Sequence, residues 1–365
     1  MWTRMRPPNL RTFLCLLAFT VLVGAHRGGA VKWLALYRRA HRPWSTTRNC
    51  SRSSGLASRQ LRLCRDNLEL MPTVVHSALV GMETCQNQFR DWRWNCSSVL
   101  AVPNLNNDLI RGTREQAYVY GISSAALVHS VSRACSIGLT SKCSCGPLPR
   151  PIDEPEEDFK WGGCGDDVTF GLSFGEQFTD ATLVNKKGRV KQSKKAMMNR
   201  HNFRVGREIV KSSLGRACKC HGVSGSCAQR TCWKALPDFE VIGAKLRERY
   251  KRTVEVKRKR KKSGGSKSLV PKRPGRSQFR QDELVHYERS PDYCSPDDKT
   301  GSVGTEGRQC TVGTRDRGSC ESMCCGRGQH NYTQVVTERC GCKYFWCCYV
   351  ECKTCTKVLQ LNRCR

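Results

Sequence analysis

The sequence predicts an α+β, disulfide-rich fold, in which a mainly helical N-terminal domain is followed by a small, cysteine-rich β domain. The 365-residue chain contains 25 cysteines; apart from Cys15 they divide evenly between Cys50–Cys232 and Cys294–Cys364. Apolar residues recur at helical spacing in the first region, whereas the second has short alternating patches rich in Gly, Thr and Tyr. Two disulfide-stabilised domains are therefore expected.

The N-terminus, residues 1–25, has the features of a secretory signal peptide. A basic stretch precedes an apolar run from Phe13 to Val23, which is shorter than the roughly 18 residues of a membrane span. We expect cleavage after Ala25 and release of the mature chain outside the cell. Cysteines that follow this route form disulfides.

Metal binding is the other common use of clustered cysteines, and the spacing argues against it. Many pairs are adjacent or separated by one residue, as in Cys324/Cys325 and Cys143/Cys145. Structural zinc sites prefer about two to four intervening residues, a spacing found in Cys352-x-x-Cys355. We therefore predict no metal ion.

Helices are predicted in the N-terminal domain, residues 26–250. Pro72 divides the first helical segment, and the pattern Thr113-x-x-Gln116 resembles a capping box at the start of the second. The segments are 58–89, 113–135, 191–217 and 237–250.

The formal net charge of +32 predicts an anionic partner. A nuclear or cytosolic chain would meet nucleic acid, whereas a secreted chain meets sulfated glycosaminoglycans, so heparan sulfate is expected and nucleic acid is not. Residues 251–282 are predicted to form a flexible basic linker. A solvated linker without a partner and furin-like cleavage are the alternatives. The heparan sulfate residues are predicted to be Lys257, Arg258, Lys259, Arg260, Lys261 and Lys262.

Residues 283–365 form the predicted cysteine-rich domain, with short strands at 332–337 and 343–350. Its low aliphatic content cannot provide a large core. Disulfides, at about 2 to 4 kcal/mol each, must therefore stabilise it by restricting the unfolded chain.

Several motifs carry a specific resemblance. The main one is Cys218-Lys-Cys-His-Gly-Val-Ser-Gly-Ser-Cys227 followed by Arg230-Thr-Cys-Trp233, supported by Arg93-Trp-Asn-Cys-Ser97 and Trp346-Cys-Cys-Tyr-Val-Glu-Cys352. With these motifs the chain resembles the Wnt family of secreted signalling proteins over nearly all of its mature length. Segments 32–36 and 63–71 are similar to the eleventh vertebrate Wnt subfamily. Gly165-Asp166-Asp167 departs from the usual Ser/Ala-Asp-Asn.

The resemblance implies that Ser224 carries a mono-unsaturated C16 acyl ester. Cys218–Cys232 and Cys220–Cys227 would form a rigid hairpin, the thumb (218–232), with Ser224 at its tip. The alternatives are that Ser224 is a simple turn residue or a hydrolase nucleophile. The Gly222-x-Ser224-x-Ser226 sequence lacks the final glycine of a nucleophile elbow, and His221 is too close in a tight loop to act as a base. We therefore expect no enzymatic activity and no cofactor.

The resemblance also implies a long C-terminal hairpin, the finger, that contacts the Frizzled receptor. Its predicted contact residues are Tyr344, Trp346, Cys347, Cys348 and Val350, with the two cysteines bonded to each other. The alternative is that these aromatic residues form the core of the second domain. The other implied disulfides are Cys50–Cys64, Cys85–Cys96, Cys135–Cys143, Cys145–Cys164, Cys294–Cys325, Cys310–Cys320, Cys324–Cys364, Cys340–Cys355 and Cys342–Cys352.

Three N-x-S/T sequons predict N-glycosylation at Asn49, Asn95 and Asn331. Asn49 and Asn95 each precede a cysteine. If the disulfide of that cysteine closes first, glycan addition at the asparagine is slowed. Asn331 is therefore the favoured site.

The implied function is that of a secreted ligand, acting in the extracellular space and matrix, mainly in β-catenin-independent signalling. The implied partners are Frizzled receptors, co-receptors of the Ror/Ryk or lipoprotein-receptor-related kind, the Wntless carrier, the Porcupine acyltransferase and heparan sulfate proteoglycans. The alternative is a heparin-binding matrix protein without receptor activation.

Overall fold

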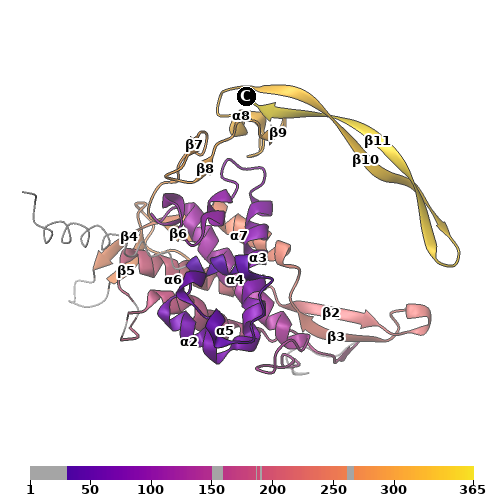
Figure 1. The fold of residues 1–365 in the computed structure, drawn as a ribbon, viewed down its shortest axis with the longest axis horizontal. Coiled ribbons are helices and arrows are strands. Elements are labelled where there is room, and N and C mark those ends of the chain that lie inside the picture. The colour runs from indigo at the N-terminus through magenta and orange to yellow at the C-terminus, as the bar shows by residue number, and fades with distance from the viewer. Residues whose placement is uncertain (1–30, 150–158, 186, 190, 261–266) are drawn as a thin grey trace, which may run out of the picture.

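The computed structural model describes residues 31–149, 159–185, 187–189, 191–260 and 267–365. The predicted signal peptide lies outside these ranges. Within them the chain forms a helical body from which two long β hairpins extend (Figure 1). No helix in this part of the chain is both long enough and apolar enough to cross a membrane.

The predicted helices of the body are confirmed, with adjusted ends. Pro72 lies in the first turn of α3, where its missing N–H costs nothing. The predicted helix 191–217 ends early because its last residues join a strand. The helices are α2 (Ser58–Asp66), α3 (Met71–Gln88), α4 (Arg114–Ser136), α5 (Val168–Asp180), α6 (Lys194–Lys211) and α7 (Phe239–Lys251).

Helix α4 runs through the centre of the body and is buried on nearly all sides. The Thr113 hydroxyl accepts a hydrogen bond from the Gln116 amide and caps the helix, as the sequence predicts. Helix α6 lies directly against α4. The two backbones are so close that a Cβ added at Gly206 would lie 2.0 Å from the carbonyl oxygen of Gly121. Gly206 of α6, which has no Cβ, therefore permits the close packing of the two helices.

Helix α5 is absent from the sequence prediction. Its two glycines, Gly171 and Gly175, weaken the helical pattern. The structure shows their role, since a Cβ at Gly171 would lie 2.2 Å from the Ser132 hydroxyl of α4. Asp167 caps the helix by accepting a hydrogen bond from the Phe170 amide.

An aromatic cluster fills the body beyond the end of α3. The Phe89 ring lies edge-to-face against Trp94, Tyr118 and Tyr250, with centroid distances of 4.8, 4.7 and 4.9 Å. It joins α3, α4 and α7, and makes the body rigid at this end.

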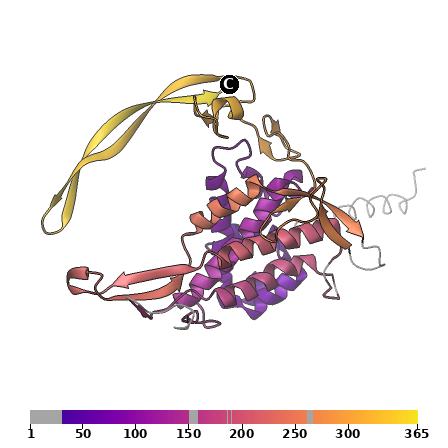
Figure 2. The ribbon, with the colours of Figure 1, turned by 180° about the vertical axis from the view of Figure 1, so that it is seen from behind.

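The thumb is a hairpin that leaves the body between α6 and α7 (Figure 2). Its strands pair antiparallel, and a short third strand joins in parallel along one edge. The strands are β1 (Lys160–Trp161), β2 (Gly215–Cys220) and β3 (Arg230–Ala235).

The prediction of a flexible linker at residues 251–282 is wrong for the described part of this segment. Val254 and Val256 are buried beside Met198 and Val285, because valine alternates with charged residues and gives one strand an apolar face. The resulting sheet comprises β4 (Val254–Arg260), β5 (Lys267–Pro271) and β6 (Val285–His286).

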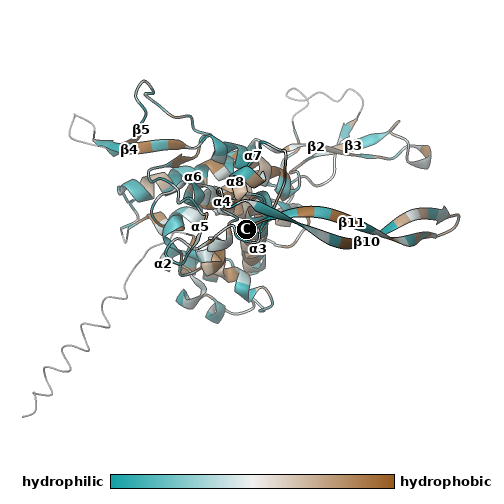
Figure 3. Ribbon diagram, turned by 90° about the horizontal axis from the view of Figure 1, so that it is seen from above, coloured by the Kyte–Doolittle hydropathy of each residue, from teal (hydrophilic) through white to brown (hydrophobic). Residues whose placement is uncertain are grey.

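The C-terminal domain is small, and its core consists largely of disulfide sulfurs. The two predicted short strands are instead parts of much longer ones, which form the finger (Figure 3). The alternation of apolar and polar residues underestimates the length of these strands. Both of their faces are exposed, so no apolar face marks the full strand in the sequence. The elements are β7 (Pro296–Asp297), β8 (Ser302–Val303), β9 (Gln309–Cys310), α8 (Cys320–Met323), β10 (Gln329–Phe345) and β11 (Tyr349–Cys364).

Candidate functional site

The thumb tip presents Ser224 to solvent. Two nested disulfides, Cys218–Cys232 and Cys220–Cys227, close the hairpin below it. Ser224 adopts a left-handed backbone with φ of 55°, and its neighbour Val223 is 90% exposed. The tip therefore offers an accessible hydroxyl beside an exposed apolar side chain.

The thumb lacks the arrangement of a hydrolase site. In the part of the chain that the structure describes, no hydrogen bond joins the Ser224 hydroxyl to a base, and His221 is itself exposed. Activation of a serine needs a base within hydrogen-bond distance and a group that orients it. Ser224 is exposed, so its hydroxyl is open to contact from outside the chain.

The base of the thumb is attached to the body by Asp166. Its carboxylate accepts hydrogen bonds from the Ser136 hydroxyl at the end of α4 (2.6 Å) and from the Leu236 amide just after β3 (2.7 Å). The guanidinium of Arg216 lies 4.6 Å from the Phe159 ring centroid. Sequence reasoning missed this role, since an aspartate within a Gly-rich stretch gives no sign of its distant partners.

The finger tip exposes a group of aromatic residues. The exposed fractions are 69% for Tyr344, 91% for Trp346 and 58% for Val350, while the Phe345 and Tyr349 rings stack at 5.1 Å. The alternative in which these residues form a core is therefore wrong. Aromatic side chains held at the end of a hairpin suit a contact surface.

The expected Cys347–Cys348 disulfide is not formed in the structure. Both residues are free thiols with positive φ, and their sulfurs lie 3.1 Å apart, well beyond the roughly 2.05 Å of a disulfide. The hydrogen bond to Cys347 raises the pKa of the Cys348 thiol. The turn between β10 and β11 thus brings the two sulfurs together without bonding them.

All the other disulfides that the resemblance implies are present, from Cys50–Cys64 to Cys342–Cys352. The sulfurs of Cys310, Cys320 and Cys324 also lie close together. They belong to two disulfides, so they are not thiolates available to a metal ion.

The three sequon asparagines differ in accessibility. Asn331 is exposed on β10. Asn49 is half-buried, and its side-chain nitrogen donates a hydrogen bond to the Pro43 carbonyl. Asn95 is half-buried, with its oxygen accepting a hydrogen bond from the Ser97 amide. The geometry favours Asn331 as the most accessible acceptor.

The basic run lies on β4. Lys257, Arg258 and Lys259 are exposed, and alternation along the strand directs the two lysines to one face and Arg258 to the other. Lys261 and Lys262 lie outside the described residues. The strand therefore spreads its charge over two faces.

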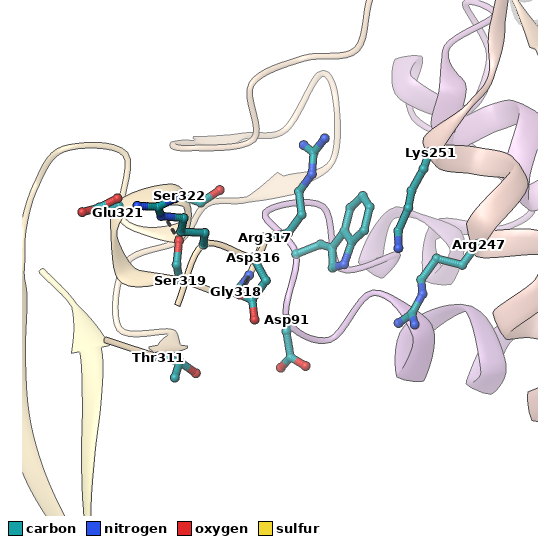
Figure 4. A pocket seen from close by; sticks show the side chains of 12 residues that line it. Asp91, Arg247, Lys251, Thr311, Asp316, Arg317, Gly318, Ser319, Glu321 and Ser322 are labelled. Atoms are coloured by element: carbon teal, nitrogen blue, oxygen red, sulfur yellow. Dashed lines mark hydrogen bonds between the residues drawn. The ribbon is translucent and has the colours of Figure 1, made fainter. Parts of the chain in front are cut away.

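A polar crevice of about 800 Å³ separates α7 from the C-terminal segment 311–322 (Figure 4). Arg247 and Lys251 line one side, and Arg317 lines the other. Trp92 and Arg315 also line the crevice. Sequence reasoning missed this feature, because its two walls are about sixty residues apart in the chain and meet only in the fold.

Comparison with known proteins agrees with this architecture. A family model described as "wnt family" matches residues 52–365. Protein Wnt-11b-2 of Xenopus tropicalis is 42% identical over 96% of this chain and 98% of its own length. Protein Wnt-11 of Gallus gallus is 43% identical over 92% of this chain and 93% of its own length.

The fold is also similar to that of a chain in the solved structure of human WLS in complex with WNT8A. The TM-score is 0.58 at 34% sequence identity, covering 82% of this chain and 95% of that chain. The family match, the full-length relatives and the shared fold agree, and the chain therefore belongs to the Wnt family of secreted signalling ligands.

Proposed function

We propose that this chain is an acylated ligand whose thumb and finger together bind the cysteine-rich domain of a Frizzled receptor. The observation that supports this most strongly is that both hairpins extend from the same side of the body (Figures 1 and 3). Each ends in exposed apolar residues, Val223 on the thumb and Trp346 on the finger. One receptor domain can then be held at two points without any chemical step.

The acyl group on Ser224 supplies most of the affinity in this proposal. A C16 chain buries apolar surface at about 0.8 kcal/mol per CH₂ when a groove accepts it. The finger contributes aromatic anchors, the residue class that dominates binding interfaces. Because the acyl chain is poorly soluble when free, a Porcupine-type acyltransferase and a Wntless-type carrier belong to the same proposal, as the similarity to the complexed Wnt fold supports.

The proposed signalling is mainly β-catenin-independent, through Frizzled with Ror/Ryk or lipoprotein-receptor-related co-receptors. The exposed Lys257, Arg258 and Lys259 add electrostatic retention on heparan sulfate in the extracellular matrix. Cleavage of the signal peptide and glycosylation at Asn331 complete the proposed maturation.

Mass spectrometry of the secreted protein tests the acylation directly. The peptide that contains Ser224 should carry the mass of a mono-unsaturated C16 ester, and Ser224→Ala should remove it together with binding to a purified Frizzled domain. Ser226→Ala is the matched control, since it changes another exposed serine in the same loop. An unmodified wild-type loop with full receptor binding would overturn the proposal.

A heparin-binding matrix protein is the second candidate, favoured by the net charge of +32 and the exposed basic strand. Such a protein should bind heparin and show no affinity for Frizzled domains. The same receptor-binding measurement therefore separates the two functions.

A further inference from the structure

Arg308 joins the C-terminal domain to the helical body. Its guanidinium donates hydrogen bonds to three backbone carbonyls, those of Arg93 (2.7 Å), Arg90 (2.8 Å) and Trp92 (2.6 Å). These carbonyls belong to the turn just after α3 (Met71–Gln88). The planar guanidinium suits this site because it can donate in several directions at once.

The same residue is attached to the base of the finger. The Cys364 amide donates a hydrogen bond to the Arg308 carbonyl (2.9 Å), and the next two residues, Gln309 and Cys310, pair with the end of β11. The disulfide Cys310–Cys320 holds this strand in place. The backbone of Arg308 is therefore fixed to the finger while its side chain is fixed to the body.

The body side of the junction is equally firm. The turn that receives Arg308 begins beside Phe89, in the centre of the aromatic cluster. Arg93 donates a hydrogen bond in the opposite direction, to the Ser322 carbonyl (2.7 Å). From here α4 leads to Ser136 and the Asp166 attachment of the thumb. Rigid elements thus connect the two hairpins through Arg308.

The crevice beside this junction leaves few contacts to orient the C-terminal domain on that side. Its volume of about 800 Å³ separates α7 from segment 311–322 (Figure 4), so close packing does not fix the angle between the parts on that side. Arg317, 5.0 Å from the Trp92 ring centroid, crosses part of the crevice by a cation–π contact. The hydrogen bonds that Arg308 donates, together with the Arg93–Ser322 bond, therefore help to fix the orientation of the C-terminal domain on the body.

We propose that Arg308 is a positioning residue, which fixes the spacing between the thumb and finger tips so that one receptor domain contacts both. This inference rests on the proposed function. Two linked contacts reinforce each other only when their spacing matches the target, and the gain can reach about 100-fold or more. Without the Arg308 hydrogen bonds the finger would change its angle, and that gain would fall.

The direct test is a thumb-to-finger distance distribution, measured by single-molecule fluorescence energy transfer on the full, acylated protein. Dyes are attached through non-natural amino acids at the exposed positions Ala228 and Lys353, because the many cysteines preclude thiol labelling. Arg308→Ala should broaden the distribution and weaken Frizzled-domain binding by about tenfold. Arg308→Lys, which keeps the charge but fewer donors, should give an intermediate result.

Arg327→Ala is the matched control. Its guanidinium also bonds to several acceptors, Arg365, Cys294 and Thr305, but all of them lie within the C-terminal domain. It should leave the distance distribution narrow. If Arg308→Ala is not secreted, Arg308→Lys carries the test alone, because its shorter list of donors cannot reproduce the three hydrogen bonds to backbone carbonyls.

The outcomes separate this inference from the proposed function. Trp346→Ala should cost less affinity in the Arg308→Ala background than in the wild type, since the two tips no longer act together. An unchanged distance distribution or equal costs in both backgrounds would overturn the positioning role. If neither Ser224→Ala nor Trp346→Ala changes the affinity for the receptor domain, the proposed function is instead overturned.

Discussion

Helix α4 and the finger are long elements in opposite environments. Nearly every side chain of α4 is buried, whereas most of those on β10 and β11 are exposed. Apolar burial stabilises the helix, but a two-stranded hairpin is marginal in water by itself. Cys340–Cys355 and Cys342–Cys352 cross-link the finger instead. The chain uses burial to make a frame and covalent bonds to hold out a contact surface.

The largest effect is expected from truncation in the body. Phe89→Ala removes a ring that is fully buried among three other aromatic side chains, so it should lower the free energy of unfolding by about 3 to 5 kcal/mol. Phe345→Ala makes the same chemical change at the finger tip and should cost less than about 1 kcal/mol. Denaturant unfolding under non-reducing conditions measures the free energy of unfolding of both variants. Equal losses in the two variants would refute the difference between the buried body and the exposed finger.

A smaller, local effect is expected from removing a finger disulfide. Cys342→Ser combined with Cys352→Ser opens a loop with a sequence separation of 10, which should destabilise the hairpin by about 2 to 3 kcal/mol. Amide hydrogen exchange should accelerate in β10 and β11 while the protection of α4 stays unchanged. A comparable acceleration in α4 would show that the finger and body unfold as one unit.

The next effect depends on pH. Burial raises the pKa of Asp108 from its ordinary 3.8 to about 7, and the charge of Glu115 adds to this rise. The folded state therefore binds a proton that the unfolded state releases, so stability present at low pH is lost as pH rises from about 4 to 7. Between pH 5.5 and 8 the loss should be about 2 kcal/mol.

Asp108→Asn should remove this pH dependence, because the amide carries no charge and its oxygen can still accept from Ser98 and Trp94. Unfolding free energies of both proteins at the two pH values provide the measurement. The prediction fails if the wild type and the variant show the same change with pH.

The smallest effect is expected on the finger surface. Val358 is 64% exposed and lies opposite Val335, so Val358→Thr should change stability by less than about 0.5 kcal/mol. Val128→Thr places the same hydroxyl at a fully buried position in α4 and should cost at least about 1 kcal/mol. A larger loss of stability in Val358→Thr than in Val128→Thr would contradict the view that burial stabilises the helical body and not the finger.

Local patterns determined much of the architecture. The capping of α4 by Thr113, the break at Pro72 and the division of the cysteines between two regions follow from neighbouring residues alone. Motif resemblance indicated Ser224 as a thumb-tip residue and Trp346 as a finger-tip residue. The helix capping and the helix break depend on short-range geometry, which a sequence records directly, whereas the two tip residues were indicated by resemblance to a known family.

The tertiary structure decided the features that join distant segments. The basic segment contributes the paired strands β4 and β5 because Val254 and Val256 pack against Met198 of α6 and Val285 of β6, which its composition conceals. Asp166 and Arg308 acquired their roles only when the fold brought the Leu236 amide and the Arg90–Arg93 carbonyls within hydrogen-bond distance. Hydrogen bonds require an orientation that sequence patterns do not encode, and so the spacing of the two hairpins is a property of the folded chain.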